Sequence, residues 1–200
     1  MPADEKAPAL ADTVLGLAAI SGSDPSFDRD LFLDGARARF LSVKQAIERR
    51  DLNPIGGAVG QGLLATLQAQ VDRLTDQHAV HRFENLSIDG MAIARAEHGE
   101  EFDNIAVRFD ARAAQYAVDE SRDQLIFGNR TIQPFIEYWT FTNRAGKRAD
   151  GPAAAPTCPT CGAPIPAGGA ATCRYCRAAL PPREVVGWTV TAIQDSIDFR

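Results

Sequence analysis

Four cysteines near the end of the chain are the residues best suited to chemistry. They form two Cys-x-x-Cys pairs, Cys158 with Cys161 and Cys173 with Cys176, and eleven residues separate the pairs. Structural zinc is bound by four tetrahedral ligands, and a two-residue gap lets one tight turn bring two thiolates to the same ion. Gly162 follows the first pair and permits the backbone turn. The spacing therefore predicts one structural zinc ion held by all four cysteines in a zinc ribbon.

Other uses of the four thiols fit the pattern less well. Two disulfides are disfavoured in an intracellular compartment. A redox pair would need only two cysteines beside a βαβ unit, and iron–sulfur clusters usually have other spacings. Arg174 and Arg177 stand where they could offset the negative charge of a zinc tetrathiolate. Because the ribbon has almost no core, metal binding, on the order of 10–16 kcal/mol in small zinc modules, must supply its folding free energy.

Histidines and carboxylates offer little sign of a catalytic centre. His78 and His81 lie three residues apart near the expected end of a helix, where surface histidines are favoured over metal ligands or bases. His98 falls in a polar loop and is expected to be solvated. We predict no catalytic residue, although one of three aspartates in or near strands could act as a base: Asp103, Asp110 and Asp119.

A set of large aromatic residues could line an apolar cavity. Such residues more often form the core, and the sequence leaves both interpretations open. The candidate pocket residues are Phe40, Phe109, Tyr138, Trp139 and Trp188.

Two helices and a run of strands must position these groups. Apolar residues at three-to-five-residue spacing predict a long helix that begins near Asp24 or Ser26, and a second helix around residues 63–81. From Glu84 the apolar period changes to two. This alternation shifts phase near Gly90 and again between Ala113 and Tyr116, which predicts two β-bulges and a strongly bent antiparallel sheet.

The fold class that follows is α+β, with helices packed on a strongly curved, cone-shaped antiparallel sheet. We expect residues 1–24 to form an N-terminal segment, either a short helix packed on the domain or a flexible lead. Residues 25–145 and 184–200 form the cone. Residues 146–183 form a zinc ribbon with linkers, inserted between the last two strands, since surface hairpins tolerate long insertions.

Composition limits the partners. The net charge is −5 and the pI is about 5.2, so nucleic acid is not expected as the main partner. No segment approaches the roughly 18 apolar residues of a membrane span, and the start lacks the basic front of a secretory signal. We expect a cytoplasmic protein, with peripheral contact to a membrane left open.

Several segments resemble a known family. They are DPSFDRDLFLDGARARFLSVKQAIERRDL, ENLSIDGMAIARAE, YAVDE, EYWTFTNRAG and GWTVTAIQ. Together they resemble the mitochondrial inner-membrane translocase subunit 44-like domain, over about residues 24–145 and 184–197. The resemblance implies a nuclear-transport-factor-2-like cone and a non-catalytic role. This chain lacks the family's long basic N-terminal region and membrane anchor, and it carries the cysteine insert.

The function predicted from these features is a non-catalytic binding or adaptor module. It would engage an apolar ligand, a lipid surface or a protein partner, and the ribbon would add an interaction surface. One alternative is a small-molecule enzyme that uses the cone. Another is nucleic-acid contact through basic residues of the ribbon segment, namely Lys147, Arg148, Arg174, Arg177 and Arg183. The oligomeric state is left open.

Overall fold

The computed structural model describes residues 6–145, 157–158, 160–164, 172–178 and 187–195. Within these residues the helices are α1 (Lys6–Ser23), α2 (Arg29–Arg49), the short 3-10 helix η1 (Asn53–Ile55) and α3 (Gln61–Asp76). The strands are β1 (Ala79–His98), β2 (Phe102–Asp119), β3 (Leu125–Gly128), β4 (Gln133–Arg144) and β5 (Thr189–Asp195).

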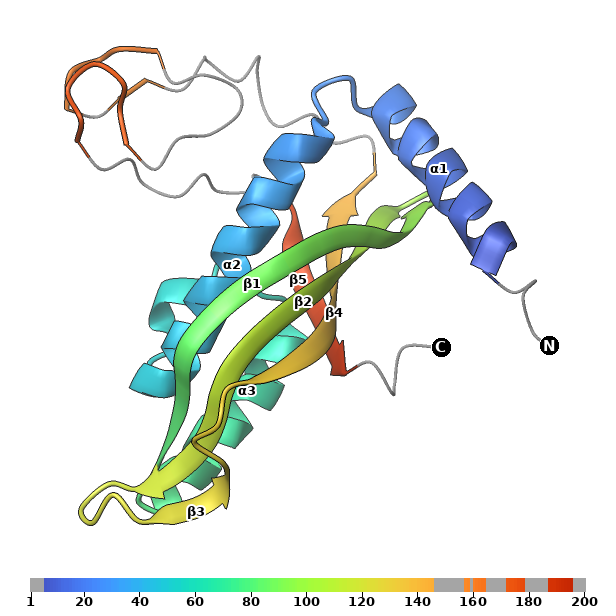
Figure 1. Ribbon diagram of the computed structural model, residues 1–200. Coiled ribbons are helices and arrows are strands. Elements are labelled where there is room, and N and C mark those ends of the chain that lie inside the picture. The colour runs from blue at the N-terminus through green and yellow to red at the C-terminus, as the bar shows by residue number, and fades with distance from the viewer. Residues whose placement is uncertain (1–5, 146–156, 159, 165–171, 179–186, 196–200) are drawn as a thin grey trace.

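The strands form one antiparallel sheet in the order β1-β2-β4-β5, and β3 pairs with β2 beyond the start of β4. The long strands bend together, with α2 and α3 on one face (Figure 1). Helix α1 lies at the end where β1 turns into β2, and β3 lies at the opposite end. The predicted α+β fold with a curved antiparallel sheet is confirmed, and the four cysteines fall between β4 and β5 as expected.

Extra residues in β1 account for part of the bend. At each of three register shifts, β1 has one more residue than β2, which adds local twist. The bulge predicted near Gly90 is therefore confirmed. The shifts fall between Glu84 and Ser87, between Ile88 and Gly90, and between Ile93 and Arg95.

The second predicted bulge, between Ala113 and Tyr116, is wrong. Pairing of β2 with β1 is regular from Ala114 to Tyr116, and the shift opposite Ala113 has its extra residue in β1, between Glu84 and Ser87, and not in β2. The apolar pattern changes phase because both faces of β2 become covered there. Ala117 packs in a cluster with Leu74 of α3, whereas the Arg130 guanidinium lies over the Tyr116 ring on the other face.

Helix α2 begins later than the sequence predicts. Asp28 is its N-cap, and the carboxylate accepts hydrogen bonds from the backbone N–H groups of Asp30 and Leu31, each at 2.9 Å. The predicted starts at Asp24 or Ser26 are wrong, because the Asp24 carboxylate instead accepts hydrogen bonds from Ser26 in the turn after α1. Such side-chain caps satisfy N–H groups that have no partner within the helix.

Helix α1 is a helix packed on the domain, one of the two forms expected for residues 1–24. A Cβ atom added at Gly16 would lie 1.9 Å from the carbonyl oxygen of Ala96, so the helix touches the β1 backbone directly. The Thr13 hydroxyl donates to the carbonyl oxygen of Ala94 at 3.2 Å, and Ile20 is buried in the core. These contacts fix which face of α1 meets the sheet.

A buried ion pair joins α2 to β4. Lys44 Nζ lies 2.6 Å from Glu137 Oε1, and the exposed fractions of the two side chains are 8% and 9%. The Trp139 indole N–H donates to the other Glu137 oxygen at 2.9 Å. The Lys44 ammonium also lies 4.9 Å from the centre of the Phe83 ring and 5.6 Å from that of Phe135. Both charges thus keep polar partners inside an aromatic surround.

We expect Glu137→Gln to lower the free energy of unfolding by about 3–5 kcal/mol, because it leaves the Lys44 charge buried without a counter-ion. The double variant Lys44→Met/Glu137→Gln should recover most of this loss, since it removes both charges and keeps an acceptor for Trp139. Urea unfolding measures both.

The matched control is Asp110→Asn, which breaks the exposed Arg108–Asp110 pair and should cost less than about 1 kcal/mol. A Glu137→Gln protein as stable as the parent would contradict a structural role for the buried pair.

Candidate functional site

The four cysteines meet at one point. Their sulfur atoms all lie within 4.8 Å of one another. Cys158 Sγ is 3.6 Å from Cys176 Sγ, and Cys161 Sγ is 3.7 Å from Cys173 Sγ. Four sulfurs around a tetrahedral ion at about 2.3 Å stand about 3.8 Å apart. The donor set therefore fits a single tetrahedral metal ion.

Two equivalent turns present these sulfurs. The Gly162 N–H donates to the Cys158 carbonyl at 2.8 Å, and the Arg177 N–H donates to the Cys173 carbonyl at 2.8 Å. Gly162 has φ 71° and Arg177 has φ 59°, so both turns end in the left-handed region. The glycine needed by the first turn is thus replaced by arginine in the second, at some conformational cost.

Backbone N–H groups of these turns stabilise thiolates. Burial alone would raise the pKa of the Cys158 thiol. Hydrogen bonds from the backbone N–H groups of Thr160 and Cys161 and from neighbouring thiols outweigh this effect and lower the pKa to about 6. The pKa of Cys173 is also lowered, first by the backbone N–H of Cys176. Thiolates are the form of cysteine that binds metal.

Three of the predicted pocket residues come together in the core. The ring centres of Phe40 and Phe109 are 4.6 Å apart, and that of Phe40 is 5.1 Å from Trp139. All three residues have an exposed fraction of 0%. Phe40 of α2 therefore packs on Phe109 of β2 and Trp139 of β4 in one contiguous aromatic cluster between the helix and the sheet.

The other two predicted pocket residues lie elsewhere. Trp188 packs at 5.1 Å from Phe32 and 5.9 Å from Phe27, between the start of α2 and the beginning of β5. Tyr138 alternates with the buried residues of β4 and lies half-buried on the opposite face of the sheet. The structure thus divides the five aromatic residues among three places.

His81 is the residue most misjudged from the sequence. Helix α3 ends at Asp76, so His81 lies in β1 and the prediction of a surface histidine at a helix end is wrong. Its ring packs 4.4 Å from that of Phe83, and its Nδ1 atom is buried without a hydrogen-bond partner in the part of the chain that the structure describes. Burial, and then the Lys44 charge, lower the pKa of His81 to about 4. The available sequence signal was the two-residue spacing of His81 and Phe83, which is typical of a strand with one covered face.

The remaining candidates are engaged in local contacts. His98 Nδ1 lies 2.6 Å from Asp103, whose carboxylate is buried. Asp110 accepts from Arg108, and Asp119 accepts from Ser121 at the turn after β2. This last hydrogen bond lowers the pKa of the Asp119 carboxyl.

An apolar surface on α1 was not predicted from the sequence. Leu10, Val14 and Leu15 are exposed by 66%, 61% and 68% respectively, although the opposite side of the helix is held against β1. None of the helices in the described ranges is both long enough and apolar enough to cross a bilayer. The exposed side of α1 is a surface feature with the composition of a docking face.

A comparison with known protein families identifies the family of this chain. The sequence profile of the Tim44-like domain matches residues 13–152, and the chain belongs to this family. No curated protein sequence matches it. The crystal structure of the intermembrane space region of chloroplast protein ARC6 is similar at 8% identity and a TM-score of 0.37, covering 79% of this chain and 88% of that one. A TM-score this low does not establish a common fold.

Family membership confirms the coarse function and corrects the location. Tim44-like domains are in general non-enzymatic modules that engage proteins or membranes, as the sequence predicts. The expected cytoplasmic location is wrong, because the family points to a membrane-associated protein of an organelle.

The lowered pKa of His81 predicts a pH-dependent stability. Between about pH 6.5 and pH 4 the unfolded chain binds a proton at this position and the folded chain does not, so the free energy of unfolding falls as pH falls. The contribution is at most about 3 kcal/mol. His81→Leu should remove it, as seen in urea unfolding at several pH values.

His78→Asn serves as the control, because His78 has φ 49° in the turn before β1 and asparagine tolerates this conformation. Equal pH slopes for His81→Leu and the parent protein would show that the imidazole is not held neutral in the fold.

Proposed function

We propose that this chain is a non-catalytic adaptor module that docks on a lipid surface through the exposed face of α1 and holds one structural zinc ion in its ribbon. The observation that carries the proposal is the exposure of Leu10, Val14 and Leu15 on a helix that is otherwise fixed to β1. The family supports a membrane or protein partner.

The chemistry of α1 favours a lipid surface with little charge dependence. Asp12 is the one charged residue of the sequence between positions 10 and 23, and the chain carries a net charge of −5. Electrostatic attraction to anionic lipid is therefore weak, and burial of apolar side chains must supply the binding free energy. Three such side chains contribute roughly 1.5–3 kcal/mol each when fully buried, as in helices that lie in the membrane interface.

An apolar ligand inside the cone is the less favoured partner. Phe40, Phe109 and Trp139 are in mutual contact and fully buried, so a ligand would have to displace their ring contacts. Close-packed interiors resist such insertion. The exposed side of α1 needs no rearrangement to bury its side chains.

Zinc is the ion that the cysteine site fits best. Four thiolates at tetrahedral positions match its preference, and all four positions are filled by protein, so the role is structural. Cys158, Cys161, Cys173 and Cys176 would hold the ion. We place them in an insertion of residues 146–183, with the cone formed by residues 25–145 and 184–200.

Co-sedimentation with zwitterionic phosphatidylcholine vesicles tests the docking surface. The parent protein should bind, and the triple variant Leu10→Gln/Val14→Gln/Leu15→Gln should bind at least about tenfold more weakly, since glutamine keeps helix propensity but removes the apolar area. Leu41→Gln, at a residue of α2 that is exposed by 42%, is the control and should bind as the parent does. If the parent protein binds neither zwitterionic nor anionic vesicles, the proposed docking on lipid is wrong.

Metal analysis tests the zinc assignment. The purified protein should contain about one zinc per chain, and Cys158→Ser should lower this content, whereas Thr160→Ser in the same turn should not. Removal of the metal should leave the circular dichroism of the cone nearly unchanged, because its core contains no cysteine. A metal-free preparation with four free thiols would refute the assignment.

A further inference from the structure

The negative charge of the chain is not spread evenly along the sequence. The ribbon segment, residues 146–183, has five basic residues and one acidic residue, so its net charge is +4 and that of the rest of the chain is −9. Neither Asp nor Glu occurs from Gly151 to Arg183. A zinc ion with four thiolates carries a charge of −2, which leaves the segment at +2. The net charge of the whole chain therefore does not describe the charge that the ribbon offers to a partner.

The second cysteine turn carries two of these positive charges and an aromatic ring. Arg174 and Tyr175 stand between its cysteines and Arg177 follows them. All three residues are exposed, Tyr175 by 64%. The corresponding positions of the first turn, which carry neither charge nor ring, are Pro159, Thr160 and Gly162. The two turns thus share a backbone hydrogen bond but present different side chains.

Arg177 adopts a backbone conformation that favours glycine. Its φ of 59° lies in the left-handed region, as does the φ of 71° at Gly162 in the first turn. Arg50 has φ 55°, and there the guanidinium is paired with Glu120. Residues in sparsely populated conformations are frequently kept for what their side chains do. We therefore expect the Arg177 side chain to have a partner.

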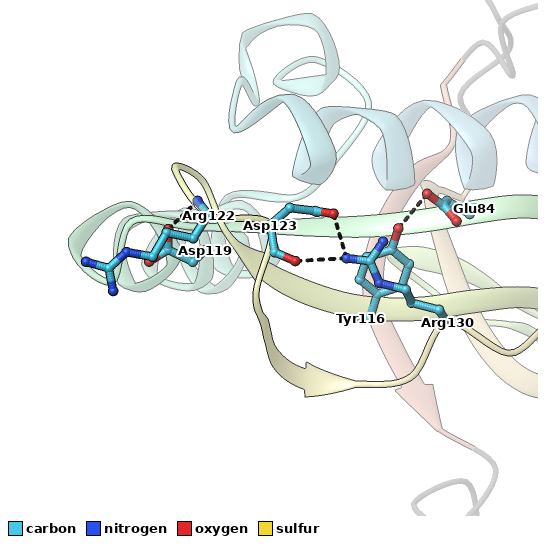
Figure 2. Close-up of polar contacts among 6 residues, drawn as sticks. All are labelled: Glu84, Tyr116, Asp119, Arg122, Asp123 and Arg130. Carbon is cyan, nitrogen blue, oxygen red and sulfur yellow. Dashed lines mark hydrogen bonds and ion pairs between the residues drawn. The ribbon is translucent and has the colours of Figure 1, made fainter.

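That partner is not found among the residues that the structure describes. Within them, neither Arg174 nor Arg177 forms an ion pair. Arginines of the cone differ in this respect. Arg130, for example, lies 2.9 Å from the Asp123 carboxylate (Figure 2). Further pairs in the cone are Arg50–Glu120, Arg95–Glu97, Arg108–Asp110 and Arg112–Asp89.

The combination of two guanidinium groups with an exposed ring favours single-stranded nucleic acid as the partner. A single strand presents phosphates together with the faces of unstacked bases, and one turn of this composition can hold both. An acidic peptide or a layer of anionic lipid supplies negative charge without base faces for Tyr175. Duplex DNA is read by a helix or a two-stranded ribbon in the major groove, and a five-residue turn provides neither.

We propose that the second cysteine turn binds single-stranded nucleic acid, with Tyr175 stacked on one base and with Arg174 and Arg177 at the flanking phosphates. Stacking accepts any base, so the turn has little sequence preference. One base and two phosphates make the interaction weak and dependent on salt. The inference rests on the zinc ion of the proposed function, which would fold the turn, and it is independent of lipid docking by α1.

Fluorescence anisotropy of labelled oligothymidylate and oligouridylate of about 12 nucleotides, at about 20 mM salt, tests binding to the full chain. The parent protein should bind both. Tyr175→Ala should weaken binding about tenfold, whereas Tyr175→Phe, which keeps the ring, should bind within about twofold of the parent. Thr160→Ala, in the first cysteine turn, is the control and should bind as the parent does.

Arg177→Gly separates nucleic-acid binding from a role in the metal site. Glycine suits the left-handed backbone, so the variant should keep its zinc. The slope of the logarithm of the association constant against the logarithm of salt concentration should become shallower by about 0.7, the contribution of one phosphate on a single strand. Arg122→Gln, which removes an exposed charge of the cone, should leave the slope unchanged. If Arg177→Gly loses zinc instead, the side chain serves the metal site and the inference is wrong.

The same samples separate this inference from the proposed function. A parent protein that holds zinc and binds neither oligonucleotide, or a Tyr175→Ala protein that binds as tightly as the parent, would overturn the inference and leave the zinc assignment standing. The triple α1 variant should bind the oligonucleotides as the parent does. If Tyr175→Ala and Arg177→Gly lose affinity for phosphatidylglycerol vesicles but keep it for oligonucleotides, the turn binds anionic lipid and the inference is again wrong.

Discussion

The ion pair between Lys44 and Glu137 is the constraint on which the rest of the fold depends. Removing two charges from water costs several kcal/mol for each ion unless they meet in good geometry. The pair forms at 2.6 Å, and a shift of α2 along β4 by one helical turn, about 5.4 Å, would separate it. In the observed placement Phe40, one turn earlier in α2, stacks on Phe109 and meets Trp139. The ion pair selects the register, and the aromatic cluster supplies apolar burial.

The sequence predicts features that depend on local spacing. The two Cys-x-x-Cys turns need only a few neighbouring residues each, and the alternation of residues 105–113 in β2 follows from one covered face. The buried state of Lys44 could not be predicted in this way, because its partner is 93 residues away and a lysine in a helix normally faces solvent. His81 was misplaced because neither glycine nor proline follows Leu74 to mark the end of the helical pattern, although the helix ends at Asp76.

Surface features show a similar limit. The apolar residues of α1 are evident in the sequence, but the contact of Gly16 with Ala96 decides which of them remain exposed. Likewise, the phase change in β2 was interpreted as a bulge, although it reflects a second covered face over Tyr116. Net charge did not indicate the compartment, because composition reflects solubility and association more than location.

The position of the cysteines between β4 and β5 has a consequence for chain topology. Pairing of β4 with β5 closes a loop of 44 residues between Arg144 and Thr189. A metal ion that links Cys158 to Cys176 would shorten the path through this loop by 18 residues. Since closure entropy grows only with the logarithm of loop length, the shorter path favours strand pairing by just a few tenths of a kcal/mol. Pairing of the last strand is therefore nearly independent of the length of the segment before it, so that segment can be lengthened or shortened without redesign of the sheet.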